Sequence, residues 1–486
     1  MSVRERSMDE VDRVRDVERS ERLHNADLAP AKQRDWNAYS LFALWMSDVH
    51  SIGGYTFAAG LFVLGLVGWQ VLIALLVGIV LVNIGVNLIG YASQRTGVPY
   101  PVIARMSFGV FGANIPALTR AIIAILWYGI QTYLASVAIV VLLLAIDPAL
   151  EPYSKGGFLG LSPLGWLAFL VLWALQLLVM RHGMETVRKY QHWAGPAIWV
   201  VMLALAVWMI VAAGGDITLN LSRHPVSGWD AVVKFLAAVS LTIAYFSTLM
   251  LNFGDFARFA PTRRAVTVGN FWGLPVNFTA FSVVTVIVTA GSISVFGEAV
   301  SDPVELVAKI PNTAVLVLGA VTFVVATIGV NIVANFVSPA YDLANLAPKY
   351  LTFRRGGLIS AVVAVLVLPW KLYSSPVVVN YFLGGLAAFL GPLFAIIAVD
   401  FYLLRKRMVN VDHLYQTSGE YYYRKGVNPR AVAAFVPAAV IAGAVALVPA
   451  LSAVAPFSWF VGAFLGGAIY YVIMKDVRRY SYDDLS

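Results

Sequence analysis

The stretch Trp45-Met46-Ser47-Asp48-Val49-His50-Ser51-Ile52-Gly53-Gly54-Tyr55 lies inside an apolar run at residues 40–66. About 20 helical residues are enough to cross the hydrocarbon core of a bilayer, so this run predicts a transmembrane helix. Asp48 and His50 are ionisable groups at membrane depth, where such groups are rare and mark functional sites. Gly53 and Gly54 each weaken a helix interior by about 1 kcal/mol relative to Ala. We therefore expect the helix to be broken at this glycine pair.

The composition of the whole chain agrees with a membrane protein. Of its 486 residues, 60% are hydrophobic and only 12% are charged, whereas soluble domains carry roughly 25% charged residues. The further apolar runs lack the alternation of a β-barrel and predict helices. They lie at about 69–94, 114–146, 163–181, 191–213, 229–253, 267–296, 312–337, 357–370, 376–404, 430–449 and 456–474. The sequence thus predicts an all-α polytopic membrane protein with twelve transmembrane helices.

The basic residues predict the orientation of these helices. With the N-terminus inside, all but five of the 34 Lys and Arg residues fall on the cytoplasmic side or its helix ends, as the positive-inside rule requires. The five exceptions are Lys155, Arg223, Lys234, Lys309 and Lys371. We expect a bacterial-type inner membrane protein with both termini cytoplasmic, whose net charge of +8 needs no nucleic-acid partner. The predicted parts are a mobile tail at 1–36, a ten-helix core at 37–404, a cytoplasmic loop at 405–429, two more helices at 430–474 and a tail at 475–486.

Two further pairs of side chains are candidates for a binding site. Trp127 and Gln131 are four residues apart and share one helix face, where an aromatic plane beside an amide would suit a flat heterocycle. Asn331 and Asn335 have the same spacing. Either pair could instead be part of ordinary interhelical packing, and the carboxylate and imidazole of the 45–55 stretch could simply pair with neighbouring helices.

Several chemistries lack their sequence signature. The chain has no cysteine, no P-loop of the G-x-x-x-x-G-K-[ST] type and no H-E-x-x-H motif. We therefore expect no cofactor, no confident metal site and no ATP-driven transport. A membrane-embedded enzyme would have only Asp48 and His50 as candidate catalytic residues. A channel, or a sensor that binds without transport, remains an alternative to a carrier.

Specific stretches give the chain a resemblance to a known family. They are Leu23-His24-Asn25-Ala26-Asp27-Leu28, Gly97-Val98-Pro99-Tyr100-Pro101-Val102-Ile103-Ala104-Arg105, Gly112-Ala113-Asn114-Ile115-Pro116-Ala117-Leu118, Trp127-x-Gly129-x-Gln131, Asn335-x-x-Ser338-Pro339-Ala340-Tyr341 and Pro369-Trp370-Lys371. With these stretches the chain resembles the nucleobase:cation symporter-1 family from about Leu23 to about Lys475, and most closely its allantoin and hydantoin permeases. The resemblance implies a leucine-transporter-like fold, with inverted repeats at about 37–213 and 229–404 and two extra helices.

The resemblance also implies site residues at mid-membrane. Trp127, Gln131 and Asn335 match the family's substrate-binding residues in kind, and Asn331 lies one turn before the last of these. Phe246 stands where the family commonly has Trp, and Ser51 stands where an amide is expected beside the helix break. These differences leave the substrate open among uracil, allantoin, hydantoin, a purine and a vitamin-like pyridine.

The coupling ion is the last expectation. Two positions that supply sodium-binding main-chain carbonyls in the hydantoin permease map to Ser47 and His50, but its two sodium-binding hydroxyls map to Gly329 and Val330. We therefore expect proton coupling through Asp48, with His50 able to help. The alternatives are a rebuilt sodium site that uses Asp48 as a charged ligand, and direct contact of Asp48 with a substrate N–H. The expected function is import of a nucleobase-like heterocycle by alternating access.

Overall fold

The computed structural model describes residues 19–477, apart from 182, 220, 223–224 and 374–383. This part of the chain contains ten helices that are long and apolar enough to cross a membrane. They are Gly68–Thr96, Asn114–Ile146, Pro163–Met180, Met184–Ala212, Gly228–Asn252, Arg263–Phe296, Thr313–Leu346, Gly385–Leu404, Pro429–Leu447 and Ala455–Met474. Each of them overlaps one of the predicted runs, and the helical fold class is confirmed.

The other two predicted runs take a different form. The run at 40–66 is divided into α2 (Ala38–Val49), α3 (Ile52–Gly60) and the short 3-10 helix η1 (Leu61–Leu64). The run at 357–370 is α16 (Phe353–Leu366), which is followed by α17 (Pro369–Tyr373). The total of twelve membrane crossings stays a prediction. It is reached only if the broken run at 40–66 and the short helix α16 each count as one crossing.

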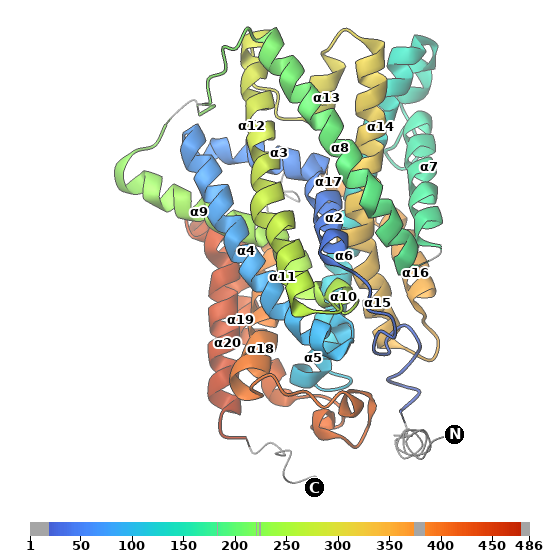
Figure 1. The fold of residues 1–486 in the computed structure, drawn as a ribbon, viewed down its shortest axis with the longest axis vertical. Coiled ribbons are helices and arrows are strands. Elements are labelled where there is room, and N and C mark those ends of the chain that lie inside the picture. Colours follow the sequence, from blue (N-terminus) through green and yellow to red (C-terminus); the bar gives the residue numbers. More distant parts are fainter. Residues whose placement is uncertain (1–18, 182, 220, 223–224, 374–383, 478–486) are drawn as a thin grey trace, which may run out of the picture.

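The remaining elements complete the helical bundle (Figure 1). They are α4 (Gly68–Thr96), α5 (Tyr100–Phe108), α6 (Asn114–Ile146), η2 (Pro148–Ser154), α7 (Pro163–Met180), α8 (Met184–Ala212), α9 (Gly228–Asn252), α10 (Gly254–Ala257), α11 (Arg263–Phe271), η3 (Trp272–Val276), α12 (Asn277–Phe296), α13 (Pro303–Ala308), α14 (Thr313–Val330), η4 (Asn331–Phe336), α15 (Val337–Leu346), α18 (Gly384–Val399), η6 (Asp400–Leu404), η7 (Asp412–Tyr415), η8 (Glu420–Tyr422), α19 (Pro429–Leu447), η9 (Pro449–Leu451), η10 (Ala455–Phe457) and α20 (Ser458–Met474).

The broken helix lies inside the bundle, whereas the last helices lie at its edge. α2 packs against α8, α11 and α14, and α6 packs against α7, α14 and α15. α19 and α20 pack against each other and against α18, and Figure 1 shows them in red at one side. The elements that carry the candidate residues, α2, α6, α9 and η4, are therefore central.

Proline explains one departure from regular α-helix near the candidate site. In α-helical pairing the N–H of residue 339 would bond to the carbonyl of Asn335, but Pro339 has no N–H. The preceding segment, η4, is a π-helix that contains both Asn331 and Asn335. Single π-helical turns inside α-helices occur frequently at functional sites.

The described part of the N-terminal tail is ordered, which corrects the expectation of a mobile segment over residues 19–36. Leu23, Leu28 and Trp36 are buried. The Asn25 amide nitrogen donates to the Leu351 carbonyl at 3.0 Å, and the Tyr415 hydroxyl donates to the Leu28 carbonyl at 2.7 Å. Apolar burial and main-chain contacts thus hold this segment against loops far away in the sequence. Residues 1–18 and 478–486 lie outside the described part.

Candidate functional site

The break in the first apolar run lies at His50 and Ser51, and not at the glycine pair. α2 ends at Val49, and Ser51 is extended, with φ −125° and ψ 161°. Its hydroxyl oxygen accepts a hydrogen bond from the N–H of Gly54 at 2.9 Å. Ser51 therefore caps α3, which is the common role of serine at a helix start. This corrects the expected position of the break, because Gly53 and Gly54 belong to the first turn of the new helix.

The two glycines instead permit close approach of other groups. A Cβ atom on Gly54 would lie 2.6 Å from the main-chain oxygen of Val49, across the break. A Cβ atom on Gly53 would lie 3.0 Å from the amide nitrogen of Gln131 on α6. The absence of both side chains lets the first turn of α3 lie close to the main chain of Val49 and lets Gln131 approach that turn.

A cavity beside this break brings most of the predicted site residues together. It is a small cavity, with a volume of about 40 Å³. Its lining comes from α2, α6, α9, α14 and η4 and consists of Asp48, Trp127, Gln131, Tyr245, Phe246, Thr248, Leu249, Val330, Ala334 and Asn335. Asp48, Trp127, Gln131, Phe246 and Asn335 are thus neighbours in space, an arrangement that only the family resemblance had led us to expect.

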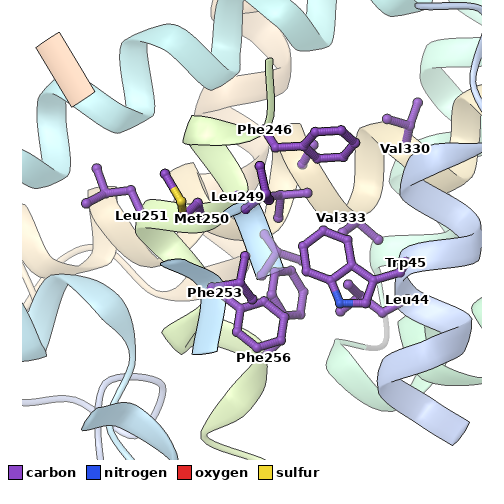
Figure 2. Close-up of a cluster of buried hydrophobic side chains, with 14 of the residues drawn as sticks. Leu44, Trp45, Phe246, Leu249, Met250, Leu251, Phe253, Phe256, Val330 and Val333 are labelled. Carbon is purple, nitrogen blue, oxygen red and sulfur yellow. The ribbon is translucent and has the colours of Figure 1, made fainter. Parts of the chain in front are cut away.

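The aromatic side of the cavity is held by packing on α9. Phe246 is buried and makes an edge contact with Phe278, with ring centres 5.1 Å apart. Tyr245 stacks on Phe57 of α3 at 4.6 Å. Figure 2 shows Phe246 and Leu249 in one cluster with Trp45 of α2, Val330 of α14 and Val333 of η4. Ring packing thus places Tyr245 and Phe246 along one side of the cavity.

Two amides face this surface in different ways. Gln131 is buried, and its amide oxygen has no hydrogen-bond partner among the described residues. Asn335 donates from its amide nitrogen to the side-chain oxygen of Asn331 at 3.0 Å. Asn331 itself does not line the cavity, and its own amide nitrogen donates to α6 and α7. Its expected contact with substrate is therefore replaced by a contact with Asn335.

Asp48 and His50 lie in different environments. The carboxylate of Asp48 lines the cavity, and the side chain is only 7% exposed. His50 instead pairs its Nε2 with the side-chain oxygen of Asn277 at 3.1 Å, and its ring lies 5.0 Å from those of Trp199 and Phe281. His50 is thus a core residue packed against α8 and α12, and the expected cooperation with Asp48 has no support in this geometry.

Neither Ser47 nor Ser51 is part of the lining of the cavity that contains Asp48. Ser51 lines a second, smaller cavity together with His50, Tyr55 and Phe281. Ser47 is fully buried with a hydroxyl that has no partner among the described residues. Its main-chain oxygen lies 3.2 Å from the point that a Cβ atom on Gly329 would occupy. The first and eighth runs therefore meet where the sodium-binding positions were expected.

Arg120 and Gln176 are two buried polar residues that the sequence reasoning missed. Arg120 of α6 donates to the main-chain oxygens of Thr248 and Ala334, which both line the cavity. Gln176 of α7 bonds to Asn331. The available signal was the same in both cases, namely a polar side chain inside a predicted transmembrane run.

The chain matches one family of transport proteins over residues 29–473, described as permeases for cytosine/purines, uracil, thiamine and allantoin. The chain belongs to this family. It is 40% identical to the allantoin permease of Bacillus subtilis (strain 168), over 94% of each chain. It is 34% identical to a purine-uracil permease of Arabidopsis thaliana, over 94% of this chain and 78% of that one. The expected membership of the nucleobase:cation symporter-1 family is confirmed.

Solved structures give the same fold. Mhp1, a transporter of the nucleobase-cation-symport-1 family crystallised in a closed conformation with bromovinylhydantoin, superposes with a TM-score of 0.76 at 24% identity, over 95% of this chain and 98% of that one. A Na⁺-coupled sialic acid symporter superposes with a TM-score of 0.64 at 11% identity, over 92% of each chain. This family member therefore has the leucine-transporter-like fold that the resemblance implies. It is a multi-pass membrane transporter and not an enzyme.

Proposed function

We propose that this permease imports a flat nitrogen heterocycle, a nucleobase or a related cyclic ureide, by alternating access. The observation that carries the proposal is the joint lining of one cavity by Trp127, Tyr245 and Phe246 with Gln131 and Asn335. A flat ring gains dispersion and electrostatic energy on an aromatic face. Side-chain amides supply both donors and acceptors, which match the alternating carbonyl and N–H groups on the edge of such a ring. Uracil, allantoin and hydantoin all have this edge.

We further propose that protons drive uptake and that Asp48 carries the transported proton. A carboxylate in the substrate cavity can exchange a proton with whichever side the cavity faces. Gly329 and Val330 lack the hydroxyl oxygens that a hard cation such as Na⁺ prefers. The competing proposal is sodium coupling, and one observation favours it: the main-chain oxygen of Ser47 lies close to Gly329, and the Ser47 hydroxyl has no partner among the described residues.

The substrate assignment is tested by uptake into proteoliposomes. Gln131→Ala is expected to abolish saturable uptake of the heterocycle, because it removes the amide that lies in the cavity. Gln191→Ala is the matched control, since Gln191 is also fully buried but lies on α8 and outside the cavity lining. Normal uptake by Gln131→Ala at equal protein abundance would refute the assignment.

The coupling assignment needs a separate gradient experiment. Wild-type vesicles are expected to concentrate substrate under a pH gradient without sodium, and to fail under a sodium gradient with equal pH on both sides. Asp48→Asn should lose concentrative uptake but keep exchange of external for preloaded substrate, since exchange needs no net proton movement. Accumulation driven by sodium alone would favour the competing ion. Absence of exchange in the wild type would favour a channel or a sensor.

A further inference from the structure

Three side-chain amides form a chain from the cavity into the fourth apolar run. The amide nitrogen of Asn335 donates to the side-chain oxygen of Asn331 at 3.0 Å. The amide nitrogen of Asn331 donates in turn to the side-chain oxygen of Gln176 on α7 at 2.8 Å. Finally, the amide nitrogen of Gln176 donates to the main-chain oxygen of Leu172 at 3.2 Å. Asn331 and Gln176 are fully buried, and Asn335 is 5% exposed.

The main chain fixes the direction of every bond in this chain of amides. An amide side chain could in principle be turned over, which exchanges its oxygen and nitrogen. The carbonyl of Leu172 can only accept, so the nitrogen of Gln176 must face it and the oxygen of Gln176 must face Asn331. Asn331 must then present its nitrogen to Gln176 and its oxygen to Asn335.

Thr132 supports the same direction from α6. Its hydroxyl donates to the main-chain oxygen of Tyr128 at 2.7 Å and is thereby left with acceptor capacity alone. It accepts from Asn331 at 3.0 Å and from Gln176 at 3.2 Å. Turning over either amide would place an oxygen against an acceptor in a buried site, where an unmade hydrogen bond costs about 1–3 kcal/mol.

Asn335 is the member of this chain of amides that lines the cavity. One hydrogen of its amide nitrogen is donated to Asn331, which fixes the orientation of the amide. Its side-chain oxygen is then its acceptor for a ligand, and the second N–H of the same nitrogen is its remaining donor. We infer that Gln176 is a positioning residue that sets Asn335 as a hydrogen-bond acceptor, so that the site selects rings that present an N–H at this point. This inference rests on the proposed transport of heterocycles and adds a rule for which rings fit. Gln131 differs, because no described residue holds its amide oxygen.

The test compares ligands that differ only in one ring atom. The probes are uracil and the two 1,3-oxazinediones in which a ring oxygen replaces N1–H or N3–H, supplemented by hydantoin and oxazolidine-2,4-dione. Dissociation constants are measured on purified protein. The wild type should bind one oxygen analogue at least tenfold more weakly than its parent ring, because an acceptor would then face the oxygen of Asn335. Equal binding of all analogues by the wild type would overturn the inference without any variant.

Three variants separate positioning from packing. Gln176→Met keeps the length of the side chain but removes the shortest contact of the Asn331 nitrogen, at 2.8 Å, and leaves only its longer contacts with Thr132 and the main-chain oxygen of Tyr128, so discrimination should fall. Gln176→Glu should keep it, because a carboxylic acid that stays neutral at this depth can accept from Asn331 and donate to Leu172. Gln191→Met is the control and should match the wild type. If Gln176→Met does not fold, Gln176→Leu takes its place.

The outcomes distinguish the two proposals. A wild type that binds none of the parent rings, allantoin included, would contradict the proposed function. A wild type that discriminates, together with a folded Gln176→Met variant that discriminates equally well, would overturn the positioning role and leave the proposed function intact. Parallel loss of affinity for ring and analogue in both Gln176 variants would show packing alone, and would also overturn it.

Discussion

Gly53, Gly54 and Gly60 lie on the same short helix, α3, but a methyl group added to each would meet a different neighbour. At Gly54 it would lie 2.6 Å from the main-chain oxygen of Val49, which cannot move without shifting the end of α2. At Gly53 it would lie 3.0 Å from the amide nitrogen of Gln131, the free end of a side chain. At Gly60 it would meet nothing within 4 Å. Replacement by Ala should therefore have three different effects.

The magnitudes follow from two opposing terms. Ala stabilises a helix relative to Gly by about 0.8–1 kcal/mol, whereas overpacking of a fixed site costs about 1–3 kcal/mol. Gly60→Ala gains the first term without the second and should be neutral or more stable than the wild type. Gly54→Ala meets a rigid main-chain atom, and the overpacking cost minus the helix gain leaves it less stable than the wild type by up to about 2 kcal/mol. Gly53→Ala displaces Gln131 by a few tenths of an ångström and should fold normally.

The functional effect should be confined to Gly53. Displacement of the Gln131 amide weakens one hydrogen bond to substrate, worth about 0.5–1.5 kcal/mol net, so the apparent KM should rise about twofold to twelvefold. Thermal unfolding of the three purified variants and uptake kinetics in proteoliposomes measure the two effects separately. The account of the helix junction fails if Gly54→Ala is as stable as Gly60→Ala, or if Gly53→Ala keeps the wild-type KM.

Two further predictions concern single contacts. Ser51→Ala removes the acceptor for the Gly54 N–H and should lower stability by about 1 kcal/mol in the same unfolding assay, whereas Ser51→Thr should retain it; equal stability of both variants would contradict the capping role. Arg405→Ala removes the ion-pair partner of the fully buried Asp400 and of Glu420 and should cost about 3–5 kcal/mol, seen as loss of folded protein. Lys155→Ala breaks the exposed pair with Glu151 and should have no measurable effect, so similar losses for the two variants would refute the role of burial.

The long helices could be predicted from the sequence because their signal is local. A continuous apolar run has only one way to satisfy its main chain in a bilayer, so its limits follow from composition. The gathering of Trp127, Gln131, Phe246 and Asn335 around one cavity is not local, and it was expected only through the resemblance to a family. The capping of α3 by Ser51 and the amide chain to Gln176 depend on distances between elements that periodicity does not give.

His50 does not meet Asp48, because α2 ends at Val49 and even a continued helix would separate the two side chains. Residues two apart on a helix point about 200° away from each other, so two polar groups at this spacing cannot share one face. Asp48 therefore lines the cavity while His50 meets Asn277 and Trp199 on the other side. By contrast, Asn331 and Asn335 lie on neighbouring turns and share a hydrogen bond. Through this bond, the chain of amides that begins at the Leu172 carbonyl orients the amide of Asn335 in the cavity. The spacing of polar residues along a helix thus predicts which of them can share a face. Their hydrogen-bond partners on other elements determine which of them points into the cavity.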